Sequence, residues 1–295
     1  MMRLSDENRL RLQQLIKEQD FAHAQEYLLN SARQTVNLTL TEPENDEQVG
    51  NSRVAGEPDL PEGTPWPLES DGVPMTFVCQ LNLEELKDLD PENRLPKSGC
   101  LLFFAGDYDL DVEHQVLYLS SKQMQTASRR SAPAPTVHEQ DEAFHSYRLQ
   151  AQASLALPGY GYVDEEAVED DDHGWEEYED LMFELAGQQD SPTMKMFGYA
   201  EGQHGDDEYL AALKLFGCES TYAPEEAIMR LTKAFGGDRE RAKREVADMV
   251  LLIEVDSDDS VGFLWGDAGV LHVFIRREDL MQGKFDRTYC SFYSS

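Results

Sequence analysis

The stretch VLLIEVDSDDSVGFLWGDAGVLHVFIRREDL, residues 250–280, carries the strongest folding signal in the chain. An apolar run at 250–255 is followed by an aspartate- and serine-rich turn, and a second run at 261–265 ends in the tight-turn sequence GDAG. A third run at 270–276 leads into REDLMQGKFD, which is typical of a short helix. Apolar runs this close together, separated by tight turns, predict an antiparallel meander.

Further strand signals lie upstream of this meander. Runs rich in β-branched, aromatic and aliphatic residues occupy 75–83, 99–108, 114–120 and 147–158, and each is bounded by turn residues. The sequence LEELKDL, between the first two runs, predicts a short helix. The chain therefore predicts a sheet with loops inserted between its strands.

Helix signals lie at the start of the chain and before the meander. Residues 5–32 predict either one helix with Ser5 as its N-cap or two short helices, the second capped by Asp20, because the apolar phase slips there. Nearer the meander, Pro224 opens one helix at its favoured first position and Asp238 caps a second.

The organisation of the chain follows from these elements. Residues 191–209 are punctuated by glycine and predict a loop, while 210–218 fits either a strand or a short helix. We expect an N-terminal helical segment at 1–40 and a domain at 41–295 with an acidic insert near 163–184.

The charge balance is the most unusual property of the chain. It carries 58 acidic and 25 basic side chains, a formal net charge of −33. This field would repel phosphates, so we expect no direct nucleic-acid partner, whereas a basic protein would be attracted. A purely solubilising role of the charge stays open as the alternative. The main basic stretch, 230–244, is expected to form salt bridges with the acidic excess.

The acidic insert at 163–184 is the densest part of this charge. No lysine or arginine occurs between Leu149 and Met194, while twelve carboxylates lie between Asp164 and Glu184. Such a block repels itself and stays solvated unless something basic is close by, which makes it a candidate partner surface. The residues that we expect to bind the partner are Glu165, Glu166, Glu169, Asp170, Asp171, Asp172, Glu176 and Glu177.

No local motif predicts catalysis, a metal or a cofactor. The four cysteines lie far apart without a CxxC pair, which predicts reduced thiols. The sequence lacks GxSxG, HExxH, P-loop and Rossmann patterns, and DSDDS at 256–260 lacks the spaced ligands of an EF-hand loop. His272 could reach toward Asp267 but is interpreted as structural. We expect no bound metal, while a site assembled from residues distant in sequence stays open.

Two features of the sequence bear on location. No apolar run approaches the ~18 residues that a membrane span needs. The first twenty residues are charged and amphipathic and have no apolar core of a signal peptide. We expect a cytoplasmic protein with no membrane partner.

The sequence GEPDLPEGTPWP, residues 56–67, holds four prolines and precedes a predicted strand with Gln80. Together with GCLLFF at 99–104, GYAEGQ at 198–203 and WGDAG at 265–269, it resembles the YwqG-like family of bacterial domains of unknown function over about residues 54–292. The matching residues are Gly56, Pro58, Leu60, Pro61, Gly63, Trp66, Pro67, Gln80, Gly99, Leu101, Phe103, Phe104, Trp265, Gly266, Asp267 and Gly269. The chain departs from the pattern where Ala200 replaces a proline and Glu254 replaces an expected glutamine.

The resemblance implies an α+β fold with mostly antiparallel sheets, peripheral helices and two related halves. Consistent with two halves, TFVCQLNLEEL…GCLLFFAGDYD echoes LLIEVDSDD…GFLWGDAG. The resemblance brings no catalytic residues. The proline-rich segment is then interpreted as fold architecture rather than an active-site wall, since prolines fix φ and restrict the unfolded chain.

The resemblance also implies a function, because similar domains occur beside secreted bacterial toxins and look like immunity proteins. It suggests a non-enzymatic protein that binds and neutralises a cognate toxin domain, a nuclease in this hypothesis, by presenting carboxylates to a basic cleft. The alternative is a small-ligand-binding protein or an enzyme with a pocket framed by the proline-rich segment and the GDAG turn.

Overall fold

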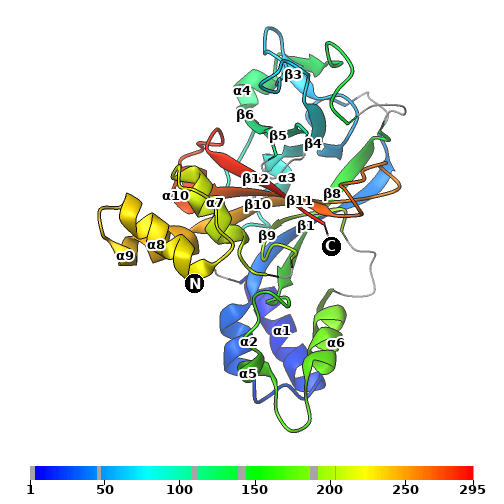
Figure 1. Cartoon of the computed structure of the whole chain (residues 1–295). Helices are drawn as coiled ribbons and strands as arrows, with labels where there is room; N and C mark the ends of the chain where they lie inside the picture. Colours follow the sequence, from blue (N-terminus) through cyan, green and yellow to red (C-terminus); the bar gives the residue numbers. More distant parts are fainter. Residues whose placement is uncertain are drawn as a thin grey trace.

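One ten-stranded antiparallel sheet organises the chain (Figure 1). The structure, a computed structural model, describes residues 4–44, 48–107, 112–138, 144–186, 192–202 and 204–294. The strands of the sheet are β1 (Arg33–Pro43), β2 (Arg53–Val54), β4 (Thr76–Asn82), β5 (Cys100–Ala105), β6 (His114–Leu119), β8 (Tyr147–Ala156), β9 (Met194–Phe197), β10 (Met249–Asp256), β11 (Val270–Arg276) and β12 (Thr288–Tyr293). A separate two-stranded sheet consists of β3 (Asp59–Pro61) and β7 (Ala127–Arg129).

The strand order is symmetrical about its middle. It runs β12-β11-β10-β9-β1-β8-β2-β4-β5-β6, so the meander β4–β5–β6 at one end mirrors the meander β10–β11–β12 at the other. The long strands β1 and β8 pair in the centre, and each lies beside the short strand of the opposite half: β1 beside β9 and β8 beside β2. The two halves of the chain therefore exchange their first strands.

The sheet curls so that its two end strands meet. The His114 Nε2 atom of β6 lies 2.9 Å from Thr288 Oγ1 of β12. Apolar side chains of β4–β6 and of β10–β12 consequently share the largest hydrophobic core, which includes Leu101, Phe103 and Ile253. Burial of this shared face is the main force that holds the halves together.

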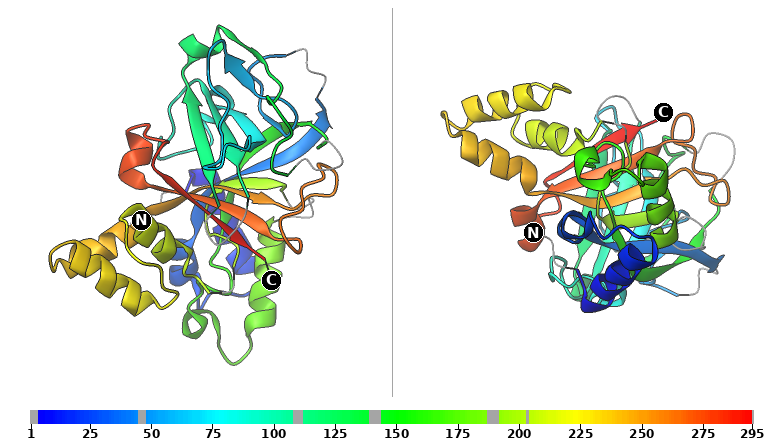
Figure 2. Two further views of the ribbon diagram at one scale, coloured as in Figure 1. Left: turned by 45° about the horizontal axis from the view of Figure 1, so that its top comes forward. Right: turned by 90° about the horizontal axis from the view of Figure 1, so that it is seen from below.

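Four helices gather at one end of the molecule, as both views in Figure 2 show. They are α1 (Asp6–Glu18), α2 (Gln25–Ser31), α5 (Glu165–Val168) and α6 (Trp175–Ala186). A separate apolar cluster joins them, with Leu12 and Phe21 from the N-terminal part packed near Tyr178 and Leu181 of α6. The acidic insert is thus anchored on the N-terminal helices.

The remaining long helices cover the C-terminal meander. They are α7 (Asp207–Leu215), α8 (Pro224–Ala234) and α9 (Arg239–Ala247), and their apolar faces pack with Leu251 of β10, Phe274 of β11 and Tyr289 of β12. The short helices are α3 (Leu83–Leu86), α4 (Ser121–Met124) and α10 (Arg277–Met281). None of the helices in the described parts combines the length and apolar character that crossing a membrane demands.

Most predicted elements are confirmed. The antiparallel α+β architecture is present, and the runs at 75–83, 99–108, 114–120, 147–158, 250–255 and 270–276 form β4, β5, β6, β8, β10 and β11. The first helical region forms two helices. Ser5 caps α1 by accepting from the Asn8 N–H, Pro224 is the first residue of α8, and Asp238 caps α9.

Three local predictions are wrong. The expected loop at 191–209 contains β9, and within the described ranges the expected strand at 261–265 forms no ladder but one isolated bridge, from Asp258 to Phe263. The residue at the N-cap of α2 is Ala24 rather than Asp20, which instead takes a left-handed φ of 58°. The helices end at Ser31, and the next residues form the central strand β1 across the expected boundary at residue 40.

Candidate functional site

The two halves repeat one backbone turn after β2 and after β9. Ala55 and Gly56 take φ values of 54° and 74°, and Phe197 and Gly198 take 67° and 84°. Left-handed backbone at a residue other than glycine is unfavourable and marks a turn that its surroundings enforce. Each turn brings the following segment back over a polar residue of the neighbouring strand.

The first charge centre lies at the turn of the N-terminal half and consists of Arg53, Asp59 and Gln80. Arg53 Nη1 lies 2.9 Å from Asp59 Oδ2, and neither side chain is exposed. Gln80 Oε1 accepts the Asp59 N–H at 3.1 Å, and Gln80 Nε2 donates to Asp59 Oδ2 at 2.9 Å. Burial raises the pKa of Asp59, but the hydrogen bond and charge of Arg53 outweigh it, so the pKa lies below its ordinary value.

The proline-rich segment wraps this centre. The Glu57 carbonyl accepts hydrogen bonds from Arg53 Nε at 3.1 Å and from Nη2 at 2.7 Å. A Cβ at Gly56 would lie 2.8 Å from Ser146 Oγ, and Trp66 donates its ring N–H to the Met75 carbonyl at 2.9 Å. Pro58, Leu60, Pro61 and Pro67 of the segment are also buried, whereas Gly63 is exposed.

The second charge centre lies at the equivalent place in the C-terminal half and consists of Lys195, Glu254, His272 and Asp256. Lys195 pairs with Glu254 across the strands as Arg53 pairs with Gln80. Glu254 Oε2 accepts the Glu201 N–H at 2.8 Å, in the way that Gln80 accepts a backbone N–H. Lys195 Nζ lies 2.5 Å from Glu254 Oε1, so the carboxylate that replaces the expected glutamine has a cationic partner.

His272 lies wholly buried between two carboxylates. Its Nε2 atom is 3.1 Å from Glu254 Oε2 and its Nδ1 atom 3.5 Å from Asp207 Oδ1, so its partner is Asp207 of α7 and not the suggested Asp267. Burial lowers the pKa of His272, but Asp207 and Glu254 outweigh it and raise the pKa to about 9. Sequence analysis missed Lys195 and Asp207, since neither belongs to a recognisable local motif.

Two further carboxyl groups of the second centre titrate abnormally. Burial raises the pKa of Glu254, but the charge of Lys195 and the contact with His272 hold it at about 2. Burial, together with the charges of Glu254 and Glu201, raises the pKa of Asp256 to about 7. The second centre therefore holds one carboxyl group, Asp256, that changes charge near neutral pH, whereas the first centre is a fixed ion pair.

The GDAG turn packs against the last strand. Gly266 takes a left-handed φ of 57°, and a Cβ added to it would lie 2.4 Å from the Phe292 ring. A Cβ at Gly269 would lie 2.1 Å from the Tyr293 carbonyl oxygen. Asp267 donates its backbone N–H to Ser294 Oγ at 3.3 Å. These contacts leave no room for a side chain at Gly266 or Gly269, so the two glycines are needed for the fold of the turn.

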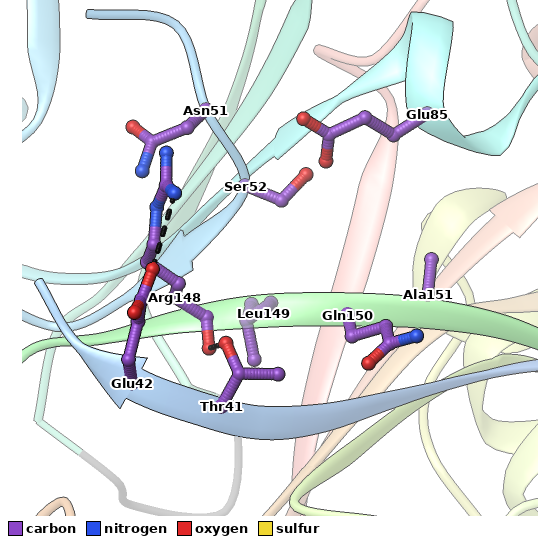
Figure 3. A pocket seen from close by; sticks show the side chains of 9 residues that line it. All are labelled: Thr41, Glu42, Asn51, Ser52, Glu85, Arg148, Leu149, Gln150 and Ala151. Carbon is purple, nitrogen blue, oxygen red and sulfur yellow. Dashed lines mark hydrogen bonds and ion pairs between the residues drawn. The ribbon is translucent and has the colours of Figure 1, made fainter. Parts of the chain in front are cut away.

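Two open pockets lie elsewhere. Figure 3 shows one of about 410 Å³ over β1 and β8, next to Asn51 and Ser52, which precede β2, and Glu85 of α3. In it Arg148 points toward Glu42, and their ion pair spans 3.4 Å. A second, of about 470 Å³, lies beside α7–α9 and is lined in part by Arg33, Glu208 and Lys243. Neither the proline-rich segment nor the GDAG turn lines either pocket.

The acidic insert forms an exposed surface on α5, α6 and the loop between them. All twelve of its carboxylate residues are exposed, including the eight predicted to bind a partner. Tyr178, Leu181 and Leu185 bury the opposite face of α6. Within the described part of the chain, the ion pairs of these carboxylates join Asp170 to two histidines and involve no lysine or arginine.

The basic stretch on α8 and α9 contrasts with this surface. Arg230 lies 2.6 Å from Glu226, and Arg239 lies 2.7 Å from Glu225. Lys243 lies 3.5 Å from Glu240. The expected salt bridges are therefore present, but they join the basic residues to nearby carboxylates of the same helix pair rather than to the acidic insert.

The fold and these centres define an α+β protein with a curled antiparallel sheet of two related halves, each with one buried charge centre. The chain belongs to the family described as a domain of unknown function, DUF1963, whose family model matches residues 52–293. The match covers both charge centres, the proline-rich segment and the GDAG turn, while α1, α2 and β1 precede it. A search of curated proteins finds no match.

Proposed function

We propose that the protein is a non-enzymatic immunity protein that binds and neutralises a cognate secreted bacterial toxin domain, a nuclease, through the acidic insert. The observation that carries the proposal is the block of twelve exposed carboxylates without a lysine or arginine partner among the described residues. The YwqG-like resemblance, which links similar domains to toxin immunity, supports it.

The chemistry of the insert suits a basic cleft. A nuclease binds phosphates with lysine and arginine, and carboxylates held on a folded surface can occupy the same positions. Phe183 is 67% exposed on α6 and lies between Asp180 and Glu184 in sequence. An exposed aromatic side chain amid charges provides the apolar anchor that protein interfaces commonly contain.

The charge distribution favours the acidic insert as the binding surface for a basic partner. Arg230, Arg239 and Lys243 pair with carboxylates of the same helix pair, so these cations do not neutralise the insert. A net charge of −33 would also steer a basic partner toward the protein and raise the association rate at low salt.

The test replaces four exposed carboxylates of the insert by amides: Glu169→Gln, Asp171→Asn, Asp172→Asn and Glu176→Gln. Asp170 is retained because it contacts two histidines. The toxin domain encoded beside this gene is titrated by calorimetry at low and high salt. We expect the variant to bind about 10- to 100-fold more weakly at low salt, with a flatter salt dependence.

A matched control removes the same charge from another exposed region, by Glu62→Gln, Glu84→Gln, Glu85→Gln and Asp88→Asn. It should change the affinity much less than the insert variant. Equal affinities and equal salt slopes for wild type and the insert variant would contradict the role of the insert. Failure of wild type to bind the neighbouring toxin domain would contradict the function itself.

A further inference from the structure

Two histidines from distant parts of the chain meet at Asp170. His23 Nδ1 lies 3.1 Å from Asp170 Oδ2, and His173 Nδ1 lies 2.9 Å from Asp170 Oδ1. One ligand atom from each residue lies within 4.8 Å of the others. His23 lies between α1 and α2, whereas Asp170 and His173 lie in the loop between α5 and α6, so the cluster joins the N-terminal helices to the insert.

The far side of the His23 ring contacts the backbone. His23 Nε2 lies 2.8 Å from the Val168 carbonyl oxygen. A neutral His23 that donates Nε2–H to a carbonyl carries its lone pair on Nδ1, the atom that faces Asp170. Histidines that bind metals characteristically donate their other ring N–H to a carbonyl or carboxylate in this way.

Aromatic packing holds both rings in place without any ligand. The Phe21 ring is fully buried, and its centroid lies 5.5 Å from that of His23 and 4.7 Å from that of His173. The two imidazole centroids are 5.0 Å apart. The side chains of His23, Asp170 and His173 remain 25%, 36% and 15% exposed, so an ion can reach them from solution.

We propose that His23, Asp170 and His173 bind one divalent transition-metal ion of the Zn²⁺ type, with water completing its coordination. Two imidazole nitrogens and one carboxylate oxygen are a donor set that suits Zn²⁺ and its neighbours rather than Mg²⁺ or Ca²⁺. In a tetrahedral site the ligand atoms lie about 3.4 Å apart. The two rings contact different oxygens of Asp170, at 3.1 and 2.9 Å, and one ligand atom from each residue lies within 4.8 Å of the others, so small side-chain shifts bring the three ligands onto one ion. The ion also satisfies the Nδ1 lone pair of a neutral His23, which otherwise faces the Asp170 carboxylate.

The surroundings strengthen the attraction for a cation. Glu169, Asp171 and Asp172 flank the cluster in sequence and are exposed. The bound ion fixes the loop of the insert to the turn between α1 and α2. Local spacing could not reveal this site, since His23 is far in sequence from Asp170; this is why the sequence predicts no metal.

The main test titrates Zn²⁺ into the chelator-treated full chain by calorimetry, with excess Mg²⁺ present to occupy oxygen-only sites. We expect one tightly bound Zn²⁺ per chain. His23→Gln and His173→Gln should each weaken binding at least about 100-fold, the upper end of the effect of altering a supporting group. His145→Gln, which changes an exposed histidine outside the cluster, should leave it unchanged.

A second measurement needs no variant. Co²⁺ bound by imidazole in a tetrahedral site gives visible absorption bands that Co²⁺ in water or on scattered carboxylates lacks, and Zn²⁺ should abolish them. The proposal is overturned if wild type takes up no Zn²⁺, if Mg²⁺ displaces it, if the bands are missing, or if both histidine variants bind as wild type does. Circular dichroism of the metal-free variants checks that they fold.

Discussion

The two charge centres occupy equivalent turns of the same sheet, yet their chemistry differs. In the first, Arg53 and Asp59 are fully buried and the partner across the strands is the neutral Gln80. In the second, Lys195 remains 22% exposed and the equivalent partner is Glu254, which also contacts His272. One backbone design thus supports a fixed ion pair in one half and a titrating network in the other.

The difference follows from a single exchange of an amide for a carboxylate. Gln80 can both accept a backbone N–H and donate to Asp59 without adding charge. Glu254 accepts the equivalent N–H but brings a negative charge that needs cations, and Lys195 and His272 provide them. Buried charges are tolerated only when they are paired, so the exchange and its partners form one unit.

The largest expected effect is on the free energy of unfolding, which should fall more when the cation of the more buried centre is removed. Arg53→Met leaves Arg129 as the one cation paired with buried Asp59 among the described residues, and we expect the free energy of unfolding to fall by about 3–5 kcal/mol. Lys195→Met should cost roughly half as much, because Lys195 is partly exposed and His272 still faces Glu254. Urea unfolding followed by circular dichroism at pH 7 measures both. Equal losses would show that the difference in burial has no energetic consequence.

A smaller effect on stability is expected from Glu254→Gln, which places in the second centre the amide that Gln80 provides in the first. Glu254→Gln removes the carboxylate shared by Lys195 and His272, so the pKa of His272 should fall from about 9. A raised pKa stabilises the fold fully below the unfolded value of ~6.5 and loses this contribution as pH rises through about 9.

The substitution should therefore lower the free energy of unfolding by about 2–4 kcal/mol at pH 6 and by less at pH 9.5. Urea unfolding at both pH values measures the stability, and an NMR titration of the His272 ring measures the pKa. An unchanged His272 titration would mean that Asp207 alone determines its charge, and that the two centres differ for another reason.

Sequence patterns predicted the parts of the fold whose signal is local. The meander strands are continuous apolar runs, and Ser5, Pro224 and Asp238 act at helix ends through neighbouring backbone groups. Strand β1, RQTVNLTLTEP, was missed although its polar and apolar residues alternate, which is the pattern of a half-buried strand. Strand β9 escaped because it has only four residues between glycine-rich segments.

The charge centres could not be predicted because their members meet only after folding. Arg53 and Lys195 each precede the same kind of turn, but the sequences RVAG and KMFG share only a glycine. Glu254 could be recognised in the sequence as a replacement of the glutamine expected at this position. Its partners His272 and Asp207 come from a strand and a helix that the pattern does not connect.

The smallest expected effect on stability concerns Asp256 of the second centre. The equivalent residue of the first half is Asn82, two residues beyond Gln80. Asp256 Oδ1 is shielded from solvent and has no hydrogen-bond partner among the described residues. Burial and the nearby Glu254 and Glu201 raise the pKa of Asp256 to about 7. The folded protein therefore keeps this proton between pH 4 and 7, where the unfolded chain loses it, and stability declines over that range.

Asp256→Asn removes the titration and should raise the free energy of unfolding by about 1–3 kcal/mol at pH 8, with little change at pH 4. Thermal melts at both pH values measure the effect, and Asp259→Asn, at an exposed position three residues away, serves as the control. A loss of stability at pH 8 would overturn the expectation, because it would mean that an ionised Asp256 is needed to balance Lys195 and His272. The second centre would then depend on two carboxylates where the first depends on Asp59 alone.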